Sequence, residues 1–274
     1  MAAVAALAED TVHQRARGHG GISAGERAGF THVATLREDG AAKIRLPRTY
    51  DRSLQAVLIN TAGGLCGGDD LRWSATASAG SHLVLTTQAC ERVYRSLGPN
   101  ADVRIELTAH AGARLDWLPQ ETILFEGARL RRRLDVDLAP DARFLAVEAV
   151  LLGRQARGEE ARNAILADNW RIRRSGSLIH AEATRLGDPA IERSANSLLA
   201  GASAFATILY VAGDAERKLE AVRALLPDTG GASVTGERLV VRALARSGMA
   251  LRRALVPVLA LLSASGSLPR LWHF

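Results

Sequence analysis

Carboxylates in unusual positions are the residues of this sequence with the clearest capacity for chemistry. The stretch NTAGGLCGGDDLRW (60–73) places Asp69 and Asp70 directly after four glycines and Cys66. A phosphate-binding loop needs a lysine and a hydroxyl after its last glycine, and these glycines do not fit the dinucleotide spacing G-x-G-x-x-G either. We therefore expect a tight strand connection, in which Asp69 is held where it can meet a cation.

Two further acids interrupt apolar strands. Glu148 lies in FLAVEAVLL and Glu182 in SLIHAEATRL. A carboxylate on a core strand is costly unless it is paired or solvated. Two interpretations stay open: ion pairs with some of the many arginines, or a polar interior such as a water-filled channel or a metal path. His180 shares a strand face with Glu182 and could bind metal with it, although such a pair is more often polar surface.

Other motifs favour neither an enzyme nor a nucleic-acid binder. The sequence has no G-x-S-x-G, no H-E-x-x-H and no zinc-type cluster. There are 35 Lys and Arg against 29 Asp and Glu, a net charge of +6. The segment RLRRRLDVD (129–137) holds four arginines but no aromatic residue on which bases could stack. It predicts a solvated strand face, or an edge for an acidic protein partner.

Strands must position these acids, because the dominant period of the sequence is two. Alternation of apolar and polar residues predicts strands in the segments 82–86, 102–107, 114–117, 133–138, 143–152, 169–174, 177–183, 205–211 and 238–244. The turn residues Gly80, Gly112 and Asp141 are 32 and 29 residues apart, and each precedes a basic residue and an apolar strand. Gly176 is a looser fourth member. A period near 30 predicts stacked β coils or a large β-sandwich.

Helices are predicted only late in the chain. One covers 214–226, with Asp214 at the N-cap, and the other covers 249–262, where Pro257 should kink or break it. The fold class is therefore mainly β, with a few α-helices towards the C-terminus.

The chain is expected to have one domain, 26–274, after a mobile lead-in of residues 1–25. Two cysteines and no export signal predict a cytoplasmic protein without a disulfide framework. The longest apolar run, 254–262, is too short to cross a membrane.

Three segments together resemble the urease accessory protein family UreD, also called UreH. They are NTAGGLCGGDDL, LVLTTQACERVYRS (83–96) and LDWLPQETILFEGARLRRRLDVDL (115–138), and the ending RRALVPVLALLSASGSLPRLWHF is also similar to that family. The resemblance covers roughly 30–274. It implies a helical-β architecture with a few helices, and a protein that is not an enzyme.

The resemblance also implies partners and a cargo. Members of this family form a complex with UreF and the GTPase UreG, dock on the urease apoprotein (UreA, UreB and UreC) and help to deliver nickel to its active site. No nucleic acid, membrane or tightly bound cofactor is implied, and Ni²⁺ passes transiently. The alternative is a purely structural chaperone of apo-urease that makes no contact with metal.

An internal acidic channel for nickel is part of what the family implies. Carried over by motif, its acids are Asp69, Glu91, Glu148 and Glu182, with Asp51 as a less secure match. The chain departs from the family pattern at Cys66 and Cys90, where small or apolar residues are expected, and at Arg92, where lysine is usual. The two cysteines leave thiol ligation open.

Overall fold

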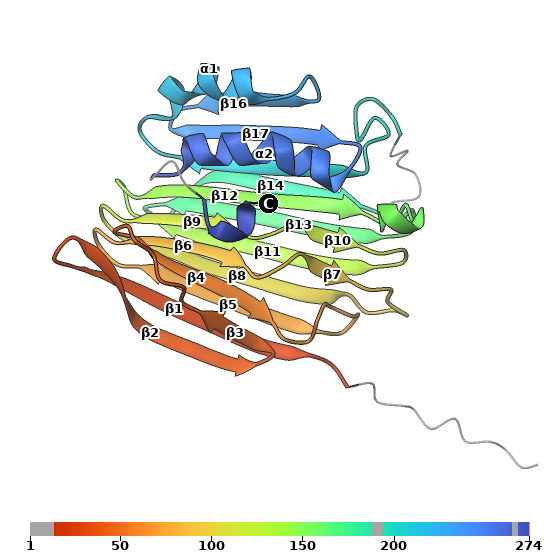
Figure 1. Ribbon diagram of the computed structural model, residues 1–274, viewed down its shortest axis with the longest axis horizontal. Coiled ribbons are helices and arrows are strands. Elements are labelled where there is room, and N and C mark those ends of the chain that lie inside the picture. Colours follow the sequence, from red (N-terminus) through yellow and green to blue (C-terminus); the bar gives the residue numbers. More distant parts are fainter. Residues whose placement is uncertain (1–13, 188–193, 265–267, 274) are drawn as a thin grey trace, which may run out of the picture.

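Two stacked β-sheets form the body of the molecule (Figure 1). The computed structural model describes residues 14–187, 194–264 and 268–273. Within this part of the chain, the first sheet has seven strands, in the order β14 (Ser177–Leu186), β13 (Ile165–Arg174), β11 (Arg129–Leu138), β8 (Ala101–Ala109), β5 (Asp70–Ala77), β1 (Arg17–Arg27) and β2 (Phe30–Gly40).

The second sheet has ten strands among the described residues. Its main path is β16 (Gly230–Thr235), β17 (Arg238–Ala245), β15 (Ala204–Val211), β12 (Arg143–Leu152), β9 (Arg114–Leu118), β6 (His82–Thr87), β4 (Leu54–Asn60) and β3 (Ala42–Arg45). The short strands β10 (Thr122–Leu124) and β7 (Glu91–Val93) lie off this path, with β10 paired to both β12 and β7.

The chain winds between the two sheets in stacked coils. From β4 to β13 it passes alternately through the second and the first sheet, and successive coils pair in parallel, as β5 does with β8 and β8 with β11. The turns stack as well, because Gly80 N donates to Ala111 O at 2.9 Å, and Gly80 and Gly112 both have left-handed φ angles, of +71° and +64°. The predicted coil architecture is therefore confirmed. Gly176 differs, since it turns the chain back into the antiparallel hairpin β13–β14.

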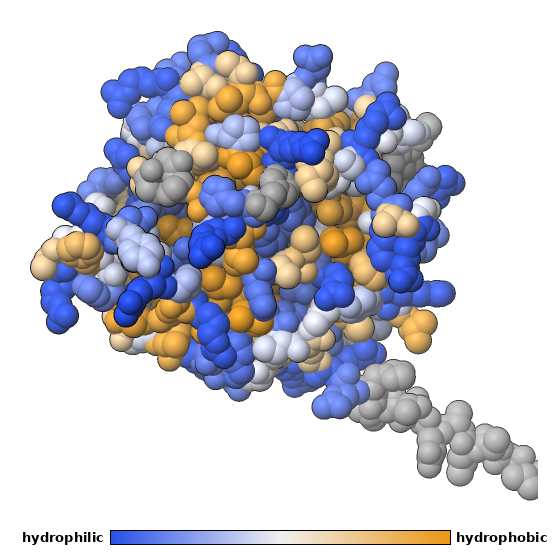
Figure 2. Space-filling model, viewed as in Figure 1, coloured by the Kyte–Doolittle hydropathy of each residue, from blue (hydrophilic) through white to orange (hydrophobic). Residues whose placement is uncertain are grey.

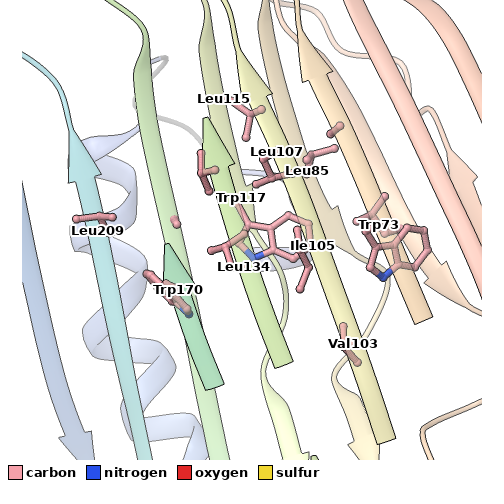
Figure 3. Close-up of a cluster of buried hydrophobic side chains, with 14 of the residues drawn as sticks. Trp73, Leu85, Val103, Ile105, Leu107, Leu115, Trp117, Leu134, Trp170 and Leu209 are labelled. Carbon is pink, nitrogen blue, oxygen red and sulfur yellow. The ribbon is translucent and has the colours of Figure 1, made fainter. Parts of the chain in front are cut away.

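Alternation along the strands builds two separate cores. The first lies between the sheets and contains Trp73, Ile105, Leu134 and Trp170 (Figure 3). The second lies on the other face of the second sheet, beneath the helices α1 (Ala215–Leu225) and α2 (Gly248–Leu262). The second sheet is thus covered on both faces, whereas the outer face of the first sheet carries alternating charged side chains.

Both predicted helices form, with two corrections. Asp214 lies at the N-cap of α1 but makes no capping bond, because its Oδ1 accepts from the hydroxyl of Tyr210 at 2.7 Å. Helix α2 continues through Pro257. The carbonyl that Pro257 leaves without a donor belongs to the exposed Arg253, where water can satisfy it. Two short 3₁₀ turns complete the described elements, Gln155–Arg157 and Arg270–Trp272. Neither helix in the described ranges has both the length and the apolar character needed to cross a bilayer.

The expected lead-in of residues 1–25 extends too far into the chain. From Arg17 onward these residues form β1, which is paired on one side with β2 and on the other with β5. Because β1 is rich in glycine, it lacks the alternation of apolar and polar side chains by which strands are recognised in a sequence. The Trp73 ring lies against Gly20 and leaves no room for a side chain there, since an added Cβ would come within 2.2 Å of Trp73 Cζ3. Residues 1–13 lie outside the described part.

We predict that Gly20→Ala lowers the free energy of unfolding by about 1–3 kcal/mol, because the buried Trp73 must move to admit the methyl group. Gly25→Ala is the matched control on the same strand, since nothing lies within 4 Å of its added Cβ. Denaturant unfolding of both variants is the measurement. Equal stabilities would show that β1 does not pack on Trp73 as described.

Candidate functional site: a polar row between the sheets

Three charged side chains meet inside the first core. Arg132 of β11, Glu148 of β12 and Asp168 of β13 are each at most 5% exposed. Arg132 Nη1 lies 2.5 Å from Glu148 Oε2, and Arg132 Nη2 donates to Asp168 Oδ2 at 2.6 Å. Strand alternation places them here, because Arg132 points inward together with Leu130 and Leu134.

Neutral partners complete this cluster. Trp117 Nε1 donates to Glu148 Oε1 at 2.9 Å, and Arg132 Nη1 donates to Thr122 Oγ1 at 3.0 Å. Burial raises the pKa of Glu148 to about 7, with Asp168 adding to the rise, while Arg132 and Trp117 oppose it. Two carboxylates thus share one guanidinium in a site closed to solvent.

Glu91 of β7 faces the same interior at its other end. Asn60 Nδ2 lies 3.2 and 3.3 Å from the two Glu91 oxygens. A cavity of about 270 Å³ opens beside them, lined in part by Trp73 and by the glycine loop at Gly63 and Gly64. Burial raises the pKa of Glu91 to about 7, while the bond from Asn60 opposes the rise. Glu91 is the register neighbour of Thr122, so the two side chains share a face.

Glu182 of β14 lies beyond the cluster on the opposite side. It accepts from Arg242 Nη2 of β17 at 2.5 Å, and His180 Nε2 lies 3.9 Å from it. Burial lowers the pKa of His180, which favours its neutral form. Arg242 is paired across the ladder with Thr207, and Thr207 with Glu148, so these three side chains share the inner face of the second sheet.

The inward-facing polar side chains therefore form one line, which we name the polar row. It runs through the apolar core and ends at the largely exposed side chain of Arg242. Its members are Asn60, Glu91, Thr122, Arg132, Glu148, Asp168, Thr207, Arg242 and Glu182. The face seen in Figure 2 gives no comparable indication, because hydrophilic and hydrophobic side chains are interspersed over it.

The structure places two of the expected path residues outside this row. Asp69 is buried, and its two oxygens accept from the backbone N–H of Ala16 at 2.8 Å and of Cys66 at 2.7 Å. It holds the glycine loop and the entry to β1 together. Asp51 is exposed and accepts from the backbone and hydroxyl of Ser53, on the helix-covered side of the second sheet. Asp69 lies close enough to Glu91 to add to the rise of its pKa, but its oxygens are occupied by the two backbone N–H groups, and Asp51 lies away from Glu91, Glu148 and Glu182.

No tight metal centre is assembled from the described residues. Within 14–187, 194–264 and 268–273, no three His, Cys, Asp or Glu side chains converge in a way that could hold a metal ion. Cys66 and Cys90 form no disulfide. Burial raises the pKa of Cys90 to about 12, and the nearby Glu121 adds to the rise. In the metal-free chain, this burial favours the neutral thiol of Cys90 over the thiolate, which is the metal-binding form.

Sequence reasoning missed Arg132 and Asp168. The arginine segment 129–137 was expected to be a solvated face, and this holds for Arg131 and Arg133 but is wrong for Arg132, which is buried. The indication was present in the alternation, since Arg132 occupies an apolar position of β11, as Asp168 does between Leu166 and Trp170 on β13.

A second polar cluster explains the WLPQE segment. Arg252 of α2 donates to Gln120 Oε1 at 2.8 Å and to Glu121 Oε1 at 3.0 Å, and its guanidinium lies 4.8 Å from the centre of the Trp272 ring. Trp272 Nε1 donates to Leu118 O at 3.0 Å. These contacts fasten the C-terminal segment to the second sheet, so Glu121 is a structural acid rather than part of the polar row.

Comparison with known proteins gives a consistent result. The family profile described as "UreD urease accessory protein" matches residues 16–273. A urease accessory protein UreD from Chelativorans sp. (strain BNC1) is 58% identical over 261 residues, which cover 94% of this chain and 94% of that protein. Proteins of the same name from Rhizobium rhizogenes and Sinorhizobium medicae are 51% and 46% identical, with 97% and 99% of this chain covered and 98% and 99% of theirs.

We predict that Asp69→Ala destabilises the fold by about 2 kcal/mol or more, because two backbone N–H groups lose their acceptor. The neighbouring Asp70→Ala is the control. It removes a partly exposed ion pair with Arg72, and such pairs contribute about 0–1 kcal/mol. Thermal unfolding of both variants tests this, and an Asp69→Ala chain as stable as Asp70→Ala would contradict the structural role.

A second prediction concerns pH. The folded chain holds a proton on Glu91 more tightly than the unfolded chain, since the pKa rises from 4.5 to about 7. The wild type therefore loses stability as the pH rises through that interval, on the order of 1–2 kcal/mol between pH 5 and pH 8. Glu91→Gln keeps an acceptor for Asn60 but has no proton to lose.

Denaturant unfolding at pH 5 and pH 8 measures this difference. Glu91→Gln should gain stability relative to the wild type as the pH rises, whereas Glu106→Gln, on the exposed outer face of β8, should follow the wild type. Parallel pH profiles for Glu91→Gln and the wild type would show that Glu91 is not held in a desolvated site.

Proposed function

Because the chain belongs to the UreD family of urease accessory proteins, we propose that it matures urease as the scaffold of a complex with UreF and the GTPase UreG. In this proposal the complex docks on the urease apoprotein, and nickel crosses the chain along the polar row on its way to the urease active site. The cytoplasm is the proposed location.

The observation that carries the nickel path is the polar row itself. It contains four carboxylates, Glu91, Glu148, Asp168 and Glu182, against the buried guanidinium of Arg132 and that of Arg242, whose side chain is largely exposed. Buried charges of this kind are expensive, and well-packed apolar residues of similar volume would often stabilise a core as well or better. An excess of buried negative charge is suited to a passing cation.

The chemistry of the row favours transit over storage. Its ligands are carboxylate and hydroxyl oxygens, and they are spread along a line instead of surrounding one point. Ni²⁺ is bound more strongly by imidazole and thiolate than by such oxygens. Each step of the row would therefore hold the ion weakly enough to release it. The chain itself performs no catalysis in this proposal, because nickel is a cargo and nucleotide hydrolysis is assigned to UreG.

A purely structural chaperone is the second candidate, and one observation favours it. All four acids of the row have a partner: Glu91 has Asn60, Glu148 and Asp168 share Arg132, and Glu182 has Arg242. Under this alternative the acids would only join the two sheets, and the protein would hold apo-urease in a receptive form without touching metal.

Complementation separates the two candidates. In nickel-fed cells that lack their own copy of this gene, we expect Glu148→Gln to lower urease activation about tenfold or more, the order of loss that disturbing a metal site brings. The amide retains the bond from Trp117 but removes the charge. Co-purification of UreF and UreG should be unchanged, because Glu148 is buried away from any docking surface.

Glu91→Gln and Glu182→Gln should reduce activation in the same direction, and Glu106→Gln is the exposed control. Activation at the wild-type level by all three row variants, with complexes intact, would refute the nickel path and leave the structural chaperone. Loss of the complexes together with activity would also favour the chaperone.

A further inference from the structure

Arg132 joins the two sheets at the centre of the polar row. Its guanidinium extends from β11 of the first sheet to Glu148 on β12 of the second sheet, and it also binds Asp168 on the adjacent β13. All three side chains are at most 5% exposed. A buried guanidinium between two carboxylates occupies the position that a divalent cation would take between the same oxygens.

The bonding of this cluster is incomplete. Arg132 Nε and Asp168 Oδ1 are buried and have no hydrogen-bond partner within the described ranges, and Glu148 Oε2 meets Arg132 as an ion pair without hydrogen-bond geometry. Buried polar atoms are normally satisfied, and exceptions call for an explanation. An ion pair that served only to join the sheets would be expected to use these atoms.

Charge balance points in the same direction. With both carboxylates ionised, one guanidinium leaves the cluster with a net charge of −1, which a proton on Glu148 offsets in the free chain, since burial raises the pKa of Glu148 to about 7. A divalent cation in place of the guanidinium would make the cluster neutral with both acids ionised. In a site this poorly hydrated, the neutral arrangement is strongly favoured by Coulomb attraction. The two carboxylates can therefore be neutralised either by Arg132 together with a proton or by one divalent cation.

We propose that Arg132 is an internal gate of the nickel path: its guanidinium occupies the cation position between Glu148 and Asp168 and must leave for a metal ion to enter. This inference rests on the proposed function and adds its regulation. The free chain keeps the path closed at this point, which prevents metal ions from binding there before the complex is assembled. Arg131, the next residue, has no such role, because it lies on the outer face and binds the partly exposed Asp102.

Removal of the guanidinium tests the gate in the purified chain, which must carry no histidine tag. Arg132→Gln leaves two uncompensated carboxylates in the core, so its melting temperature should be lower than that of the wild type without metal. Added Ni²⁺ should restore it. At a concentration tenfold above its dissociation constant, the metal should raise the melting temperature by about 3 °C or more.

Two controls make the measurement specific. The melting temperatures of the wild type and of Arg131→Gln should show no comparable rise with Ni²⁺, because Arg132 still occupies the cation position in both. The triple variant Arg132→Gln/Glu148→Gln/Asp168→Asn should also show none, because it has no charge left to attract the ion. Equilibrium dialysis with Ni²⁺ should give about one additional bound ion for Arg132→Gln only.

Failure of Arg132→Gln to fold does not weaken the test. Folding of this variant only when Ni²⁺ is present would support the gate. If it stays unfolded with and without Ni²⁺ while the triple variant folds, a metal ion cannot replace the guanidinium and the proposal is wrong. A folded Arg132→Gln chain whose melting temperature does not change with Ni²⁺ would also overturn the proposed gate. The complementation result for Glu148→Gln would still decide the proposed function by itself.

Discussion

In-register pairing of parallel strands is the constraint on which the rest of the molecule depends. Each coil repeats the inward and outward positions of the coil before it, so Trp73 is aligned with Ile105 and Ile105 with Leu134 across three strands. A shift of one residue in any coil would turn its whole apolar set to the outer face. The stacked turns, with Gly80 bound to Ala111, fix this register at one end of the coils.

Because of the same register, the second sheet carries apolar side chains on both faces, so each face needs a covering layer. The inward residues of this sheet fill the first core. Leu145, Val147 and Tyr210 point to its other face, where they would be exposed if no other element covered them. Helix α2 and the C-terminal segment do so, and Arg252 and Trp272 hold that layer in place. This explains why a mainly β chain ends in helices, and why the WLPQE segment and the C-terminus lie together.

The polar row opposes this pattern in the core between the two sheets. Arg132, Glu148 and Asp168 occupy positions where the alternation calls for apolar residues, and burial makes such positions costly for charge. In the function proposed above, a cation that passes through the protein accounts for them, and the guanidinium of Arg132 partly compensates their charges while that cation is absent.

The sequence by itself determined the fold class, the coil period, the two late helices and the presence of acids on core strands, because all of these follow from alternation, turn residues and motif within short segments. Only the tertiary structure decided which acids meet. Glu91, Glu148 and Glu182 share one interior, Asp69 binds two backbone N–H groups near Glu91, Asp51 lies on the exposed surface, and Arg132 is turned inward instead of facing solvent. These contacts join residues from different coils, so they depend on register between strands and on the packing of one sheet against the other, neither of which is encoded in any single segment.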